Sequence, residues 1–268
     1  MSEEAALYEK AKGLFEDTEH NEYFVLLTRT RLAYGKLVNS LKNPFKIILL
    51  YGRPGTGKSY LLQRFFFDHK DRFSMFLYKN PTFSGEDRLI EIYESIWQER
   101  PAAKDLHTLI AAFKAKTQEP IYILLDEAQL YSDDRLEWIR TLSNEEVFRF
   151  IIVVHKVDQE DLLAKEHFKT RTFETIEIGS IDLAEVSRFV ETKLLLGELP
   201  EFYDRFKRRN FERIYQLTRG NLRDINRLMH RFFDLLSEMA QKKPHRIPSR
   251  FSNRLLEMAA LDLGMLNG

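Results

Sequence analysis

The chain has 268 residues, and its 41 basic and 41 acidic side chains give a formal net charge of zero. Hydrophobic residues make up 44% of the chain, which is enough apolar material for one large domain or for a larger and a smaller one. There is no apolar run near 18 residues, no leader with a cleavage site and no cysteine. We therefore expect a globular cytoplasmic protein without a membrane span, disulfides or thiolate chemistry.

The charge is unevenly distributed. Residues 1–22 carry seven acids and two lysines, a net charge of −5. Residues 205–254 carry fourteen Lys or Arg and four Asp or Glu, a net charge of +10. The second region is either a contact surface for an anionic partner such as nucleic acid, or a solvated helical surface that is basic.

Apolar runs alternate with segments of helical periodicity in the first two thirds of the chain. A helix is predicted over 29–41, before the first strand. The predicted strands cover 45–51, 73–78, 121–125, 150–154 and 173–178, and the helices between them 58–68, 87–98, 106–116 and 134–142. Strands joined by crossover helices predict an α/β fold with a five-stranded parallel sheet sandwiched by helices.

Strand signals stop near residue 180, and amphipathic helices follow. They are predicted at 183–196, 201–208, 210–217, 222–239 and 249–263. The resulting division is an acidic N-terminal segment at 1–22, an α/β nucleotide-binding domain at 23–180, a helical lid domain at 181–240, and a basic linker with a helix at 241–268.

The nucleotide prediction rests on the segment GRPGTGKS at 52–59, which fits G-x-x-x-x-G-K-[ST] and follows the apolar run 47–51. Glycines let backbone N–H groups turn inward around an anion, and the following helix points its positive end at the phosphates. The alternative is a glycine turn that binds nothing. Residues 156–158 lack the leading Asn of a guanine signature, so ATP with Mg²⁺ is favoured. The predicted binding residues are Gly52, Pro54, Gly55, Thr56, Gly57, Lys58, Ser59 and Tyr60.

Four side chains of the two motifs have predicted roles. Lys58 reaches the β- and γ-phosphates, and the Ser59 hydroxyl ligates Mg²⁺. The strand at 121–125 delivers Asp126 and Glu127 to the edge of the sheet where ligands collect. Asp126 is expected to hold Mg²⁺ through water and Glu127 to polarise the attacking water. The alternative for this acidic pair is a helix N-cap with an acid in the first turn.

Further residues are candidates for sensing the γ-phosphate. His155, with Lys156 as competitor, follows the fourth predicted strand; the alternative is a solvated strand end. Arg171 precedes the fifth strand and, in a ring or filament, can enter a neighbour's site; the alternative is an exposed loop arginine. Arg223 starts a helix on which Arg227 and Arg231 share its face, and is best placed to report on the nucleotide.

Together, GRPGTGKS, ILLDEAQ at 123–129, Arg171 and GNLRDINRL at 220–228 resemble the AAA+ branch of the phosphate-loop ATPases, over about residues 22–238. The DEAQ tetrad at 126–129 and the helical lid resemble the general secretion pathway protein A group. Transposition helper ATPases and Cdc6/Orc proteins are similar at the same level. The resemblance implies ATP hydrolysis, nucleotide-dependent assembly of copies and a helical lid over the nucleotide. The chain departs from the family at the sensor-one position, where His155 or Lys156 stands in place of the usual Asn, Thr, Ser or Gln.

Three functions follow from this resemblance. The first is ATP hydrolysis that drives a secretion, pilus or DNA-uptake machine through a partner protein, with the chain peripheral at the inner membrane where that partner is membrane-bound. The second is a DNA-associated ATP switch that uses the basic region 205–254. The third is a scaffold with negligible turnover, against which the intact Glu127 argues.

Overall fold

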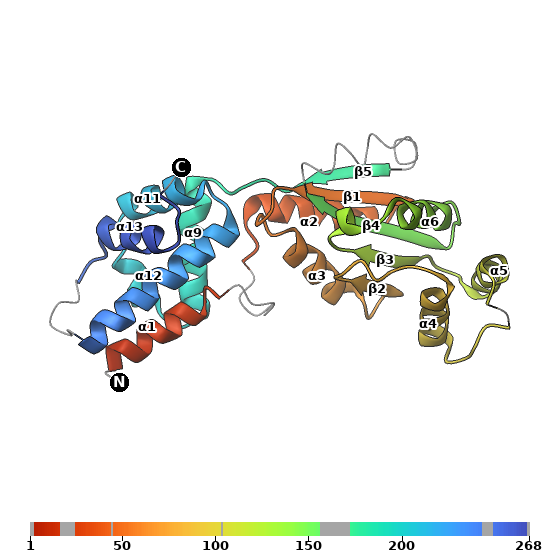
Figure 1. Ribbon diagram of the computed structural model, residues 1–268, viewed down its shortest axis with the longest axis horizontal. Helices are drawn as coiled ribbons and strands as arrows, with labels where there is room; N and C mark the ends of the chain where they lie inside the picture. Colours follow the sequence, from red (N-terminus) through yellow and green to blue (C-terminus); the bar gives the residue numbers. More distant parts are fainter. Residues whose placement is uncertain are drawn as a thin grey trace. The chain divides into compact units, whose positions relative to one another are not determined.

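The computed structural model describes residues 3–16, 25–43, 45–102, 104–155, 172–242 and 249–266. The chain divides into two compact units (Figure 1). The helical unit comprises Met1–Arg31, Gly55–Gly57 and Gly179–Gly268, and the sheet unit comprises Leu32–Pro54 and Lys58–Ile178. Within the described ranges, no helix combines the length and apolar character needed to cross a membrane.

The sheet unit is built on five strands: β1 (Ile47–Gly52), β2 (Met75–Tyr78), β3 (Ile121–Leu125), β4 (Phe148–His155) and β5 (Thr172–Glu177). All neighbouring strands are parallel, in the order β2-β3-β4-β1-β5. This topology confirms the predicted fold class. Because β4 lies between β1 and β3, its carboxyl end is flanked by the two segments that carry the predicted nucleotide motifs.

The helices of the sheet unit are α2 (Thr28–Ser40), α3 (Lys58–His69), α4 (Glu86–Trp97), α5 (Leu106–Lys116) and α6 (Asp133–Ser143). Alternate strand residues such as Ile123 and Phe150 share one buried core with side chains of α4, α5 and α6. Helix α3 contacts β1, β2 and β4. Strands buried on both faces explain why the sequence shows continuous apolar runs.

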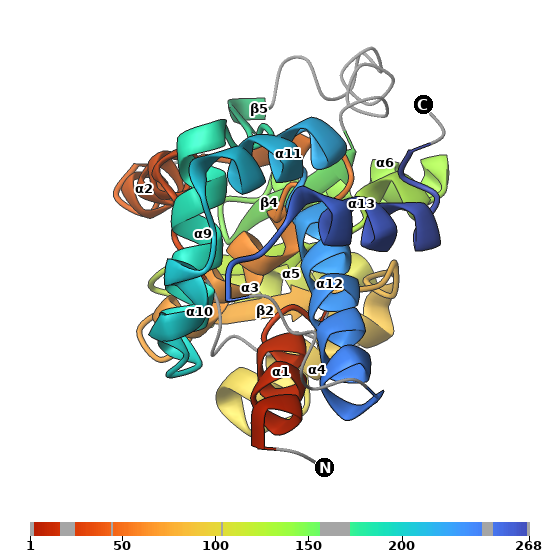
Figure 2. The ribbon, with the colours of Figure 1, turned by 90° about the vertical axis from the view of Figure 1, so that its left-hand side faces the viewer.

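The helical unit contains α1 (Glu3–Gly13), α9 (Leu183–Leu196), α10 (Pro200–Asp204), α11 (Arg208–Thr218), α12 (Leu222–Lys242) and α13 (Asn253–Asp262). Aromatic side chains fill its centre: Tyr8 stacks on Phe202 at 5.0 Å, and Phe251 packs against Phe206 at 4.7 Å between ring centroids. Figure 2 shows α1 beside α12, which it contacts. The described elements of this unit are all helices.

Two helical details differ from the sequence-based expectation. The helix predicted at 201–208 is wrong, because α10 ends at Asp204 and Arg208 already begins α11. The side chain of Asn210 accepts a hydrogen bond from the N–H of Lys207 at 2.7 Å, which fixes the start of the new helix. Helix α1, which we did not predict, buries Ala5, Tyr8 and Ala11 in the core of the helical unit.

Candidate nucleotide-binding and hydrolysis site

The loop between β1 and α3 depends on two glycines. Gly55 and Gly57 have φ values of 79° and 92°, in the left-handed region that glycine adopts without steric cost. A Cβ atom on Gly55 would lie 2.3 Å from Oδ1 of Asn221, which belongs to the same helical unit. No other residue type fits Gly55 without displacing this neighbour, so the sharp turn expected of a phosphate loop is built into the backbone.

Lys58 is the buried cation of this loop. Its side chain is only 5% exposed, although it stands in the first turn of α3. The Nζ atom donates hydrogen bonds to the carbonyl oxygens of Gly52 at 3.0 Å and Arg53 at 3.1 Å. An ammonium group binds phosphate oxygens more strongly than neutral carbonyl oxygens, because bonds between two charged groups are stronger.

Ser59 and Asp126 are brought together from α3 and the end of β3. Asp126 is 5% exposed and hydrogen-bonded to the side chain of Ser59. Burial raises the pKa of Asp126, although the bonds from Ser59 and the backbone N–H of Glu127 and the charge of Lys58 act to lower it. A buried carboxylate beside a hydroxyl provides the oxygen donors that a hard divalent cation binds.

The carboxylate oxygens of Asp126 and the hydroxyl oxygen of Ser59 are suitable ligands for Mg²⁺. Among the residues that the structure describes, no group of three or more His, Asp or Glu side chains is arranged to hold a metal ion by itself. Magnesium commonly keeps several waters and is bound through one or two carboxylates together with substrate phosphates. Ser59 and Asp126 would therefore hold the metal, with the triphosphate and water supplying the other oxygens.

Glu127 occupies an unusual backbone conformation. Its φ of 51° is left-handed, and the chain turns there from β3 into the short 3₁₀ helix η2 (Ala128–Leu130). Such a conformation costs on the order of 1–3 kcal/mol for a residue with a side chain. Nε2 of His155 lies 3.5 Å from Oε2 of Glu127, and Nε2 of Gln129 donates a hydrogen bond to the same oxygen. The turn thus gathers three polar side chains beside Asp126.

His155 ends β4 and lies opposite Gly52 of β1 in the parallel register. The structure thereby places the imidazole at the strand end between the two motifs. Lys156, the competitor for the sensor role, and Arg171 both lie outside the described residues. The sensor role of His155 stays a prediction.

Arg223 lies in the first turn of α12, where its backbone N–H donates to Oδ1 of Asn221 at 3.1 Å and to the carbonyl oxygen of Gly55 at 3.2 Å. The arginine side chain is exposed. Its proposed contact with the γ-phosphate remains a prediction. Of the other predicted binding residues, Thr56 is buried in the loop and Tyr60 is half-buried in α3.

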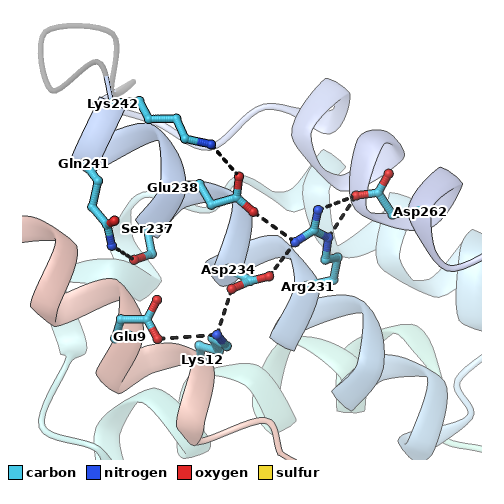
Figure 3. A network of polar contacts seen from close by, with 9 residues as sticks. All are labelled: Glu9, Lys12, Arg231, Asp234, Ser237, Glu238, Gln241, Lys242 and Asp262. Carbon is cyan, nitrogen blue, oxygen red and sulfur yellow. Dashed lines mark hydrogen bonds and ion pairs between the residues drawn. The ribbon is translucent and has the colours of Figure 1, made fainter.

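The arginine face predicted on α12 does not act as one surface. Arg231 contacts Asp234 and Glu238 of its own helix and Asp262 of α13, as Figure 3 shows. Arg227 approaches Asp224 at 3.8 Å. Gln129, which contacts Glu127, was not among the predicted site residues. Its place in the DEAQ tetrad, two residues after Glu127, was the available signal.

Residues 43–163 match the family model described as AAA domain (AAA_22). An ORC2 protein from Aeropyrum pernix in ADPNP and ADP complexes is similar in structure, with a TM-score of 0.59, 14% identity, and coverage of 93% of this chain and 70% of that one. Cdc6p from Pyrobaculum aerophilum gives a TM-score of 0.62 at 14% identity, covering 94% and 70%. The chain has the AAA+ phosphate-loop fold.

The RuvB Holliday junction branch migration motor of Thermotoga maritima is also similar, with a TM-score of 0.56, 15% identity, and coverage of 88% of this chain and 67% of that one. No curated protein matches the sequence. At these identities the structural similarities establish the AAA+ fold of the chain, and its activity has to be argued from its own site.

Proposed function

We propose that this AAA+ chain binds ATP with Mg²⁺ and hydrolyses it to ADP and phosphate. The observation that carries the proposal is the convergence of a buried cation, Lys58, with a buried carboxylate, Asp126, that is hydrogen-bonded to Ser59. Lys58 supplies positive charge to a triphosphate directly, and Asp126 would supply it by holding a divalent cation beside the phosphates.

In the proposed reaction, Lys58 neutralises the β- and γ-phosphates, and Ser59 and Asp126 hold the metal. Glu127 accepts a proton as water attacks the γ-phosphorus, a bond forms from the water oxygen to phosphorus, and the bond to the ADP oxygen breaks. His155, 3.5 Å from Glu127, is placed to orient that water or to sense loss of the phosphate. Arg223 is proposed to contact the nucleotide from α12.

The test measures ATP affinity and phosphate release on the full chain. Lys58→Ala is expected to lose ATP binding, and Glu127→Gln to keep binding while turnover falls about 100-fold or more. The matched control is Glu119→Gln, because Glu119 is an exposed carboxylate just before β3, at the other end of the same strand. Normal hydrolysis by Glu127→Gln would overturn the assignment of the base.

We also propose that nucleotide drives assembly of copies in which Arg171 acts on a neighbour's site. Arg171→Ala and Glu127→Gln would then be inactive separately, and their mixture would regain part of the turnover, because some interfaces combine two intact halves. If both variants assemble and the mixture stays inactive, copies do not share a site through Arg171.

For a secretion, pilus or DNA-uptake machine, the partner should co-purify with Glu127→Gln held in its ATP state.

The second candidate function is nucleic-acid contact through a basic cluster made of Lys207, Arg208, Arg209, Arg250 and Arg254. The first turns of α11 and α13 lie side by side, because Nδ2 of Asn210 donates to Oδ1 of Asn253 at 2.7 Å. The four arginines are exposed, and neither helix has an acid in its first turn. Arg208 pairs with Glu212 at 3.0 Å, as Arg231 pairs with acids of α12 and α13. The arginines proposed to contact the phosphate backbone are therefore Arg209, Arg250 and Arg254.

Salt dependence tests this candidate. If Arg209 and Arg254 each neutralise a phosphate, replacing either by Ala weakens DNA binding and makes the slope of log affinity against log salt shallower by about one. Arg188→Ala is the matched control, since Arg188 is an exposed arginine on α9 of the same unit. Binding that does not respond to salt, or responds equally in the control, would exclude this surface.

A further inference from the structure

Gln129 lies in the middle of η2 and is half-buried. Its Nε2 donates to Oε2 of Glu127 and lies 3.5 Å from Nδ1 of His155. Its Oε1 is buried and has no hydrogen-bond partner among the described residues. One amide therefore joins the proposed base to the end of β4 and also carries a buried acceptor atom without a partner among the described residues.

The local backbone explains how Gln129 reaches this position. The left-handed residue Glu127 ends the strand, and the N–H of Leu130 then donates to the carbonyl oxygen of Glu127 at 3.0 Å. This single tight turn keeps η2 in contact with β4. Leu130, the next residue, is 62% exposed, so within the turn Gln129 faces the site and Leu130 does not.

The orientation of the amide follows from the charge of its partner. With Glu127 ionised, both carboxylate oxygens are acceptors, so only the NH₂ end of Gln129 can face them. Rotation of the amide by 180° would set two acceptors against each other. The Oε1 atom is then left for a donor, and an unsatisfied buried acceptor costs on the order of 1–3 kcal/mol. A water O–H is a donor that fits, because a site beside Glu127 must admit water for hydrolysis.

We propose that Gln129 is a positioning residue for ATP hydrolysis. This inference rests on the ATPase function proposed above. Its N–H group holds Glu127 by Oε2 so that Oε1 of the carboxylate faces the attacking water, and its own Oε1 accepts a hydrogen bond from water. The amide does this without titrating or exchanging a proton. The proton released by the attacking water goes to Glu127, and Gln129 keeps the same two hydrogen bonds throughout.

The residue type matters for this role. Asn is one methylene shorter and cannot span the same gap, while Glu would place a second carboxylate against Glu127. Gln129→Ala is expected to lower kcat for phosphate release about tenfold with KM for ATP nearly unchanged, since the base is misplaced but nucleotide contacts remain. Gln129→Glu should lower kcat further, and Gln129→Asn should not restore it. Leu130→Ala, in the same turn, is the matched control and should leave kcat unchanged.

A double-mutant cycle separates positioning from general support of the fold. If Gln129 acts through Glu127, adding Gln129→Ala to Glu127→Gln produces no further loss of kcat. Thermal unfolding and ATP affinity are measured for each variant. Both measurements check that the kcat values compared come from folded proteins that bind ATP. An unchanged or raised kcat in Gln129→Ala, or an equal loss in both backgrounds, would overturn this inference and leave the ATPase proposal standing. Absence of turnover in the wild-type chain would overturn both.

Discussion

The two units use charged side chains in different ways. In the helical unit, oppositely charged side chains meet across helices, as where Nζ of Lys12 in α1 lies 2.7 Å from Oδ1 of Asp234 in α12 (Figure 3). In the sheet unit, Asp126 is buried at a strand end with a hydroxyl and a backbone N–H as its hydrogen-bond donors. The first arrangement fastens helices together, and the second leaves a buried carboxylate whose proposed task is to hold a cation.

The pKa values of these two aspartates express the difference. Burial acts to raise the pKa of Asp234, but hydrogen bonds from Lys12 and Arg231 outweigh it, so the pKa is lowered. Burial also acts on Asp126, and there the hydrogen bonds and the charge of Lys58 do not offset it, so the pKa is raised. A charged residue that opposes folding is retained where it has another task.

The largest effect is expected from Asp126→Asn. Mg²⁺-dependent turnover should fall 100-fold or more because the metal loses a charged ligand, whereas without nucleotide the free energy of unfolding should rise by about 1 kcal/mol because a buried charge is removed. Phosphate release and urea unfolding measure the two effects. Asp134→Asn, an exposed acid in the first turn of α6, is the control. Metal-dependent turnover that survives in Asp126→Asn would remove Asp126 from the site.

The helical unit should respond in the reverse manner. Arg231→Leu is expected to lower the free energy of unfolding by about 1–2 kcal/mol, since three carboxylates lose their shared partner, while ATP hydrolysis per folded molecule stays unchanged. Arg227→Leu on the same helix is the control, with one carboxylate at 3.8 Å and a smaller expected loss. Equal losses in the two variants would show that the network adds nothing beyond ordinary surface pairs.

The motif-bearing elements of the sheet unit could be predicted from the sequence. The apolar run of β1 and the glycines of the following loop determine a local structure, so Gly55, Gly57 and Lys58 lie where the motif requires. The parallel sheet could be predicted because the strands β1 to β4 are apolar runs separated from one another by helices. The local sequence pattern was sufficient to predict structure wherever the interacting residues are close in sequence or belong to one motif.

Contacts between distant segments could not be predicted. Helix α1 buries alanines and a tyrosine rather than large aliphatic residues, so its sequence reads only as an acidic segment. The partner of Arg231 in α13, Asp262, is 31 residues away, so the sequence left an apparently basic helix face. Gln129 and His155 are 26 residues apart and meet only because β4 lies next to β3. These pairings depend on tertiary packing that periodicity does not encode.

The opposite pKa shifts of the two aspartates predict opposite pH dependence. Because the pKa of Asp234 lies below its ordinary value of 3.8, its contribution to stability is present above that value and is lost as pH falls through the lowered pKa. Because the pKa of Asp126 lies above 3.8, the folded state gains from protonation, and stability falls as pH rises through the raised pKa. Urea unfolding from pH 3 to 6 should show Asp234→Asn removing the first slope and Asp126→Asn the second. The same slope change in both variants would contradict this division.

The smallest effect is expected from His69, at the end of α3 in the sheet unit. Burial lowers its pKa from 6.5, its ring packs against Phe65 at 4.9 Å, and Nε2 is buried without a hydrogen-bond partner among the described residues. The neutral ring is therefore favoured in the folded state, so its contribution is complete above pH 6.5 and declines as pH falls below it. Urea unfolding should show that His69→Phe flattens the stability profile between about pH 7 and 5. If His69→Phe leaves the pH profile of stability unchanged, the imidazole is protonated as readily in the folded chain as in the unfolded one. Its buried ring nitrogen would then have a hydrogen-bond partner in solvent.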